Sequence, residues 1–139
     1  MKVLNTLFLV FIVVGSYAQS NDSLAVVSTT EKYIQAFYQS NPDWLEEVLH
    51  PELIKRTTKS YGDSQEFIIT NGKIVMVELS KIFNSKGQYN NLSSAEIEVL
   101  DITGNMATVK LLAEKWVDYL HLVKLNNEWK IVNVIWTMI

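Results

Sequence analysis

The densest apolar pattern lies at the end of the chain. Two apolar runs, 116–125 and 129–139, flank the polar Asn126-Asn127-Glu128, and this arrangement predicts a β-hairpin. In the second run both alternating sets of positions are apolar: Trp129, Ile131 and Ile135 form one set, and Val132, Val134, Trp136 and Met138 form the other. A strand with one face in water alternates apolar with polar residues. We therefore predict a central strand here, covered on both faces.

Two more strands are expected before this hairpin. The segments 95–102 and 106–114 are separated by the turn sequence Thr103-Gly104-Asn105. Together with the last hairpin they predict an antiparallel meander of four strands.

The first half of the chain shows helical spacing instead. Asn21-Asp22-Ser23 offers helix-capping oxygens and precedes an amphipathic stretch that ends before Asn41 and Pro42. The apolar residues of this stretch are Leu24, Val27, Ile34, Phe37 and Tyr38. A second helix is predicted to begin with Asn41 as its cap and Pro42 in its first turn, and to end near His50, before Pro51.

The segment 65–84 admits two interpretations. Asn71-Gly72 between apolar runs is typical of a two-residue hairpin, whereas Val75, Leu79 and Ile82 fit a helical stripe. We favour a short strand at 67–69 followed by a third helix from about residue 72 to 84. Helices first and strands afterwards predict an α+β fold. Three helices would close the concave side of a curved antiparallel sheet, and the other face would meet a partner subunit or the back of a bent sheet.

The first 18 residues have the features of a secretory signal peptide. Lys2 precedes the apolar run 7–14, and the small residues Gly15, Ser16 and Ala18 follow it. This apolar run is much shorter than the ~20 residues that span a bilayer. We expect cleavage after Ala18 and export to the periplasm or the medium, which would leave one domain over 19–139, with 139 less 18, or 121, residues.

The net charge and the absence of cysteine exclude several kinds of site and argue against some partners. Without Lys2 the chain has 11 Lys and Arg against 15 Asp and Glu, a net charge of −4, and it has no cysteine. Disulfides, thiolate metal sites and cysteine nucleophiles are excluded. An acidic domain without a basic run is not expected to bind nucleic acid or an anionic membrane surface.

The order of these elements and motifs is familiar. His50-Pro51-Glu52-Leu53 and Lys55-Arg56-Thr57, the third helix, and the ending from Asp118 to Asn133 resemble the "putative lumazine-binding" family of the nuclear transport factor 2-like superfamily, which includes ketosteroid isomerase and the SnoaL-like polyketide cyclases. The resemblance covers about 23–138. It implies a cone-shaped α+β roll with a pocket between helices and sheet, usually in a homodimer. A fold of this kind hosts many chemistries.

Asp118 is the strongest candidate for chemistry. Strand alternation places it on the face of Trp116, Leu120 and Leu122, and a carboxylate among apolar neighbours can act as a general acid or base. The alternative is that a bulge turns Asp118 outward or that it pairs with a lysine or arginine. His50 is a second catalytic candidate, although a capping or packing role at a helix end is the commoner explanation for such a histidine.

A ligand pocket could draw on further side chains. Arg56 could bind an anionic ligand or form a structural ion pair, and aromatic residues could form a flat slot for a ring-shaped ligand. The predicted pocket residues are Tyr38, Arg56, Tyr61, Trp116, Asp118 and Trp136. His121 has the opposite alternation from Asp118, so the two should not meet. We predict no metal and no cofactor.

Three functions remain open at this stage. The first is an exported, non-catalytic domain that holds a small apolar or ring-shaped ligand in its cone. The second is an isomerase, dehydratase or cyclase with Asp118 as general acid or base and Tyr61 or His50 polarising a carbonyl. The third is a dimeric structural module whose cone is filled.

Overall fold

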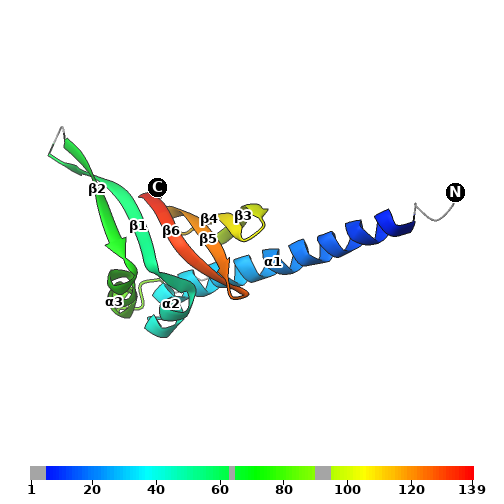
Figure 1. The fold of residues 1–139 in the computed structure, drawn as a ribbon. Helices are drawn as coiled ribbons and strands as arrows, with labels where there is room; N and C mark the ends of the chain where they lie inside the picture. Colours follow the sequence, from blue (N-terminus) through cyan, green and yellow to red (C-terminus); the bar gives the residue numbers. More distant parts are fainter. Residues whose placement is uncertain (1–5, 63–64, 90–94) are drawn as a thin grey trace.

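The computed structural model describes the backbone of residues 6–62, 65–89 and 95–139, and side chains within these ranges from residue 21 onward. Three helices pack on one six-stranded sheet (Figure 1). The elements are α1 (Thr6–Tyr38), α2 (Pro42–Val48), β1 (Leu49–Tyr61), β2 (Gln65–Gly72), α3 (Lys73–Phe83), β3 (Glu96–Thr103), β4 (Met106–Leu112), β5 (Trp116–Leu125) and β6 (Glu128–Met138). The predicted α+β class is therefore confirmed, as is the third helix.

The sheet is mixed, with the strand order β2-β1-β6-β5-β4-β3. Strands β3 to β6 form the predicted antiparallel meander. The sequence did not indicate β1, which pairs antiparallel with β2 and parallel with β6. The last strand is consequently central, as predicted, with β1 on one side and β5 on the other.

The outer part of β1 forms an arm with β2. Figure 1 shows this two-stranded ribbon extending away from the helices toward its turn. From residue 58 to 61 every side chain of β1 is exposed, and β2 is exposed along most of its length. A strand that projects beyond the core can be polar on both faces, and this is why β1 has no apolar alternation.

A β-bulge at Val132 changes the interpretation of the last strand. His121 pairs with Asn133, but the next pair is Leu122 with Ile131, so β6 has one extra residue at Val132. The bulge moves the apolar residues from one alternating set to the other. Trp129, Ile131, Val134, Trp136 and Met138 therefore all lie on the inner face.

The prediction that both faces of β6 are covered was wrong for the single chain. Ile135 is 53% exposed on the outer face, beside the exposed Tyr119 of β5. At the bulge, the inward-facing positions change from odd-numbered to even-numbered residues. Both alternating sets are apolar for this reason, and not because both faces are buried.

The first helix also differs from its predicted start. α1 begins at Thr6 and continues without interruption through residues 21–23, so these residues are not its cap. Asp22 instead accepts hydrogen bonds from Lys124 Nζ at 2.6 Å and from Trp129 Nε1 at 3.3 Å. These two hydrogen bonds link α1 at Asp22 to the β5–β6 hairpin.

The hydrophobic core lies between the helices and the concave face of the sheet. Its largest fully buried side chains come from α1, α2, β1, β4, β5 and β6. They include Tyr33, Leu45, Leu49, Leu111, Leu120, Leu122 and Ile131. The core leaves a cavity between α1, α3 and the ends of β5 and β6.

Candidate functional site

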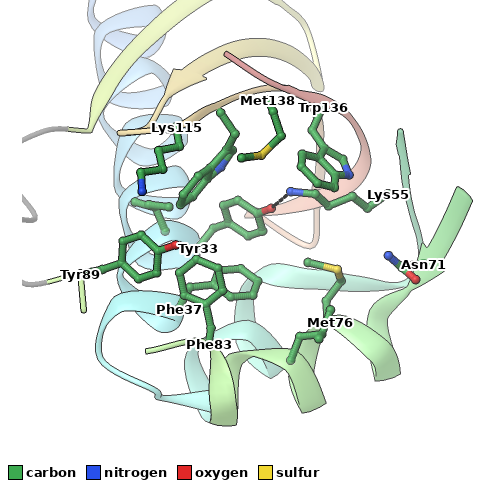
Figure 2. Close-up of a pocket in the computed structure, with 13 residues that line it drawn as sticks. Tyr33, Phe37, Lys55, Asn71, Met76, Phe83, Tyr89, Lys115, Trp136 and Met138 are labelled. Atoms are coloured by element: carbon green, nitrogen blue, oxygen red, sulfur yellow. Dashed lines mark hydrogen bonds between the residues drawn. The ribbon is translucent and has the colours of Figure 1, made fainter. Parts of the chain in front are cut away.

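A cavity of about 230 Å³ lies between α1, α3 and the concave face of the sheet (Figure 2). Its walls are mostly apolar. The apolar lining residues are Ile34, Phe37, Met76, Leu79, Phe83, Trp116, Trp136 and Met138. The polar ones are Tyr33, Lys55, Asn71, Tyr89 and Lys115.

One side of the cavity is a wall of aromatic rings. Phe83 and Tyr89 stack with their ring centroids 4.9 Å apart, and Trp116 meets the Phe83 ring edge-on at 5.7 Å. Tyr38 packs behind this wall, 6.3 Å from Trp116. Such ring pairs are rigid and present flat surfaces to a planar ligand.

The opposite side carries a buried polar triad of Tyr33, Lys55 and Asp118. Lys55 Nζ donates to both carboxylate oxygens of Asp118, at 2.9 and 2.8 Å, and to the Tyr33 hydroxyl at 2.8 Å. The Tyr33 hydroxyl donates in turn to Asp118 Oδ2 at 2.9 Å. Asp118 is 0% exposed and Lys55 only 7%. The triad is a closed ring of hydrogen bonds in an apolar surrounding.

Three adjacent strands hold the triad together. Lys55 on β1 pairs with Val134 on β6. Asp118 on β5 pairs with Trp136, which is also on β6. The two charged groups thus reach toward each other over β6 on the inner face, and Tyr33 comes from α1 above them. The parallel β1–β6 pairing brings Lys55 to Asp118.

Burial is the main cause of the pKa shifts of Lys55 and Tyr33. Removal from water lowers the pKa of Lys55 below its usual 10.5, and the charge and hydrogen bonds of Asp118 oppose this effect. The pKa of Tyr33 is raised well above 10.0, first by burial and then by the negative charge of Asp118. Tyr33 is therefore a neutral hydrogen-bond donor at ordinary pH, and Lys55 loses its proton more easily than a lysine in water does.

A further polar group in the cavity wall has no partner. Trp136 Nε1 is buried, and no acceptor for it lies among the described residues. The Trp136 ring also faces the Lys55 ammonium, 5.3 Å from its centroid. Trp136 therefore combines a ring surface with an unused hydrogen-bond donor.

The structure places three of the predicted residues at or next to the cavity. Trp116 and Trp136 line it, and Asp118 lies behind Lys55 on the inner face. Asp118 pairs with a lysine, one of the alternatives considered above, and it also faces inward. Tyr38 is buried in the aromatic cluster behind the lining.

The other predicted residues lie elsewhere. Tyr61 is 78% exposed at the outer end of β1, and Arg56 faces outward and donates to Asn133 Oδ1 at 2.8 Å. His50 accepts a hydrogen bond from the backbone amide of Glu52, outside the cavity. His121 lies within 3.1 Å of Asn133 Nδ2 on the outer face, away from Asp118 as predicted. The unpredicted strand β1 carries Arg56 and Tyr61 away from the cavity.

Sequence reasoning missed Lys55 and Tyr33, the two partners of Asp118. Lys55 lies in a run of polar residues, where a lysine is usually in water. Only the apolar Leu53 two positions earlier, on the same side of an extended chain, could have indicated that it faces inward. Tyr33 precedes the apolar Ile34 in the helical pattern and was not distinguished from the core.

Neither a metal-binding cluster nor a membrane-spanning helix is found in the described part of the chain. No group of three or more His, Asp or Glu side chains there is arranged to hold a metal ion. Nor does any helix in that part combine the length and the apolar character needed to cross a membrane.

Comparison with known families decides the classification. The model of a family described as "Putative lumazine-binding" matches residues 21–137. The chain belongs to this family. The match covers almost all of the region over which the sequence resembled it.

The fold of this chain is similar to that of solved NTF2-like proteins. An NTF2-like protein of unknown function from Silicibacter pomeroyi has a TM-score of 0.67 at 13% identity, and the match covers 87% of this chain and 98% of that one. A second, from Methylobacillus flagellatus, has a TM-score of 0.63 at 23% identity, with coverage of 86% and 93%. A ketosteroid isomerase-like protein from Erwinia carotovora atroseptica has a TM-score of 0.53 at 10% identity, with coverage of 84% and 95%. These likenesses establish the fold. A search of curated proteins gave no match.

Proposed function

We propose that this protein is an exported domain that binds a small, mostly apolar, ring-bearing molecule in the cavity between α1, α3 and the sheet. The observation that carries the proposal is the cavity itself, with an aromatic wall on one side and a few polar groups on the other. Ligand pockets commonly have this composition. A filled cone, as a purely structural module would have, does not match it.

The size and lining indicate what kind of molecule fits. A cavity of about 230 Å³ is small for a ligand site and suits a molecule of one or two rings. The ring surfaces of Phe83, Trp116 and Trp136 suit a planar apolar body. Trp136 Nε1 offers a donor to a carbonyl or ether oxygen, if the ring shifts slightly to expose it.

Ligand binding can be tested by thermal shift and calorimetry with named probes. We expect 2-naphthol to raise the melting temperature more than lumazine does, because the lining has few partners for the polar edges of a pteridine. Equal or stronger binding of lumazine would contradict the proposed apolar preference. Native mass spectrometry that finds no binding of either probe would contradict the pocket proposal.

A matched pair of variants on α3 localises the binding. Leu79→Trp places an indole in the cavity lining and should abolish the shift by 2-naphthol. Ile82→Trp adds the same ring on the exposed side of the same helix and should leave the shift unchanged. Equal loss in both variants would show that the probe does not bind in the cavity.

The buried triad favours a second candidate, proton transfer at a carbonyl compound. Asp118 is the base in this version, and Tyr33 takes the polarising role once assigned to Tyr61 or His50. Lys55 and Tyr33 cover the Asp118 carboxylate, so this function requires that the substrate reach it past them. Exchange of α-protons of 2-tetralone in D₂O, followed by NMR, would support this function if it is lost in Asp118→Asn. No exchange above the buffer rate would exclude it for this substrate.

Export is the remaining part of the proposal. The motivating feature is the basic, apolar and small-residue order of the first 18 residues. Peptide mass spectrometry of the protein recovered from its source organism should find an N-terminal peptide that begins at Gln19, as glutamine or pyroglutamate. A mature chain that still begins at Met1 would refute cleavage.

We also propose that two copies associate through the outer face of the sheet. Tyr119 and Ile135 are directly opposite each other on β5 and β6, and they are 45% and 53% exposed. The Arg56–Asn133–His121 hydrogen-bond row borders this pair. An apolar centre with a polar border is typical of interfaces between subunits.

A further inference from the structure

We propose that Lys55 forms a reversible Schiff base with an aldehyde or ketone whose apolar body occupies the cavity. This inference rests on the proposed binding function and adds to it a covalent step and a ligand class. It would make the pocket selective for carbonyl compounds among molecules of similar shape.

The first support is the position of the amine. Lys55 is one of two lysines that line the cavity, and it is the buried one. Figure 2 shows its ammonium group among the Tyr33, Trp136 and Met138 side chains, at the inner end of the cavity. A carbonyl group carried by an apolar ring would come close to Nζ when the ring rests on the aromatic wall.

The second support is a proton acceptor in contact with the amine. A lysine is nucleophilic only after it has lost a proton. Asp118 oxygens lie 2.8 and 2.9 Å from Nζ, within reach for direct transfer. The transfer converts an ion pair into a neutral amine and a neutral acid, and an apolar surrounding favours neutral forms. Burial acts in the same direction on the pKa of Lys55.

The steps balance within the triad and the ligand. A proton moves from Nζ to Asp118, and the free amine then forms a C–N bond to the carbonyl carbon while the C=O electron pair moves to oxygen. Asp118 gives its proton to that oxygen and takes one from nitrogen, which yields a carbinolamine. Asp118 then protonates the hydroxyl group, the C–O bond breaks, and water leaves as C=N forms.

The product fits the site electrostatically. The iminium nitrogen keeps one proton and one positive charge, so the Asp118 carboxylate still has its counter-ion. Tyr33 can go on donating to Asp118 Oδ2 throughout the sequence, as it does in the free protein. No oxidant, reductant or metal is needed, and water reverses the reaction.

Reductive trapping tests the proposal. The full chain is incubated with 2-naphthaldehyde and sodium cyanoborohydride, and the labelled lysines are identified by peptide mass spectrometry. We expect labelling at Lys55 to be faster than at the exposed Lys59 by about tenfold or more, as expected for a positioned reaction. Labelling that follows exposure, or that occurs at Lys115 with Lys55 unmodified, would overturn the proposal.

Two variants on β1 form the matched control. Lys55→Arg keeps the positive charge beside Asp118 but lacks the nucleophile, so the fast label should disappear. Lys59→Arg, on the exposed part of the same strand, should leave the label at Lys55 unchanged. If Lys55→Arg does not fold, the peptide map of the wild-type chain still decides between Lys55 and the other lysines.

2-Naphthylmethanol separates this inference from the binding proposal. This alcohol has the same ring system without a carbonyl group. If it binds, and the aldehyde is not trapped at Lys55, the Schiff base is refuted and the pocket stands. If the aldehyde labels Lys55 and excess alcohol suppresses the label, the Schiff base and ligand binding in the cavity are both supported.

Discussion

At the scale of single residues, burying the charges of Lys55 and Asp118 carries a large desolvation penalty. Two opposite charges that are removed from water are stabilised only while they remain paired. Tyr33 adds one hydrogen bond to each partner, because it donates to Asp118 and accepts from Lys55. An apolar pair of similar volume would serve stability equally well or better. Stability alone therefore does not account for the triad, in agreement with the role proposed for Lys55.

Breaking the pair should cost much more than replacing it. Lys55→Met leaves Asp118 buried without its cation, and we expect a loss of about 3–5 kcal/mol in the free energy of unfolding. The double variant Lys55→Met/Asp118→Leu should recover most of that loss. Urea unfolding of the three proteins measures both values. A double variant no more stable than the single one would show that the pair contributes net stability.

Tyr33 predicts a specific pH dependence. Its pKa is raised in the folded chain, by burial first, whereas unfolding returns it to about 10.0. Above pH 10 the unfolded chain therefore loses the phenol proton while the folded chain keeps it. The contribution of Tyr33 to the free energy of unfolding is thus complete below pH 10 and is lost as the pH rises above 10. The difference in stability between the wild type and Tyr33→Phe should fall by about 1.4 kcal/mol per pH unit above pH 10. A difference that stays constant from pH 8 to 11 would contradict this.

Sequence reasoning reached part of the site and could not reach the rest. Alternation along one strand was sufficient to place Asp118 inward, because β5 is regular over that stretch. It could not place Lys55, because the contact depends on β1 lying parallel to β6, a pairing between segments about 80 residues apart. Tyr61 was misplaced for the same reason: nothing local shows that β1 continues beyond the core.

At the scale of elements, the bulge in β6 decides which side chains face the cavity. Val132 and Asn133 both lie away from the core, between the inward Ile131 and Val134. This adjustment is what lets Trp129 and Trp136, which belong to different alternating sets, face the same way. A single sequence shows the two sets but not the residue at which the phase changes.

Two single-residue deletions in β6 should destabilise the protein to different extents. Deleting Val132 removes the extra residue and leaves a regular strand, with Val134 and Trp136 still inward, so we expect a folded protein with a modest loss of stability. Deleting Ile135 turns Trp136 and Met138 outward, with a loss comparable to truncating a large core residue, about 3–5 kcal/mol. Thermal unfolding by circular dichroism compares them. Equal losses would contradict the assigned bulge.

At the scale of the whole molecule, the curved sheet has one face in the core and one that a single chain leaves open. The fold class, the order of the helices and the antiparallel meander followed from the sequence, because periodicity and turn residues are local signals. The mixed character of the sheet did not follow, since it depends on how β1 returns to β6.

The proposed dimer gives a measurable outcome. We expect sedimentation velocity to find a dimer for the wild type and a monomer for Tyr119→Glu/Ile135→Glu, because the two negative charges on each copy would meet those of the other copy at the interface. Ile74→Glu, on the exposed side of α3, is the control and should remain dimeric. A wild-type chain that is monomeric at all concentrations would refute the proposal.

The position of β6 has a consequence for how the protein is made. Of the six strands in the sheet, β6 is synthesised last, yet it lies in the middle, between β1 from the first half of the chain and β5 from the second. Before β6 is added, β1–β2 and β3–β5 are two separate ribbons with no strand pairing between them, so no strand yet holds Lys55 beside Asp118. The sheet can therefore be completed only after Met138 has left the ribosome, and a chain truncated before residue 128 would lack Trp136 and Met138 of the cavity wall.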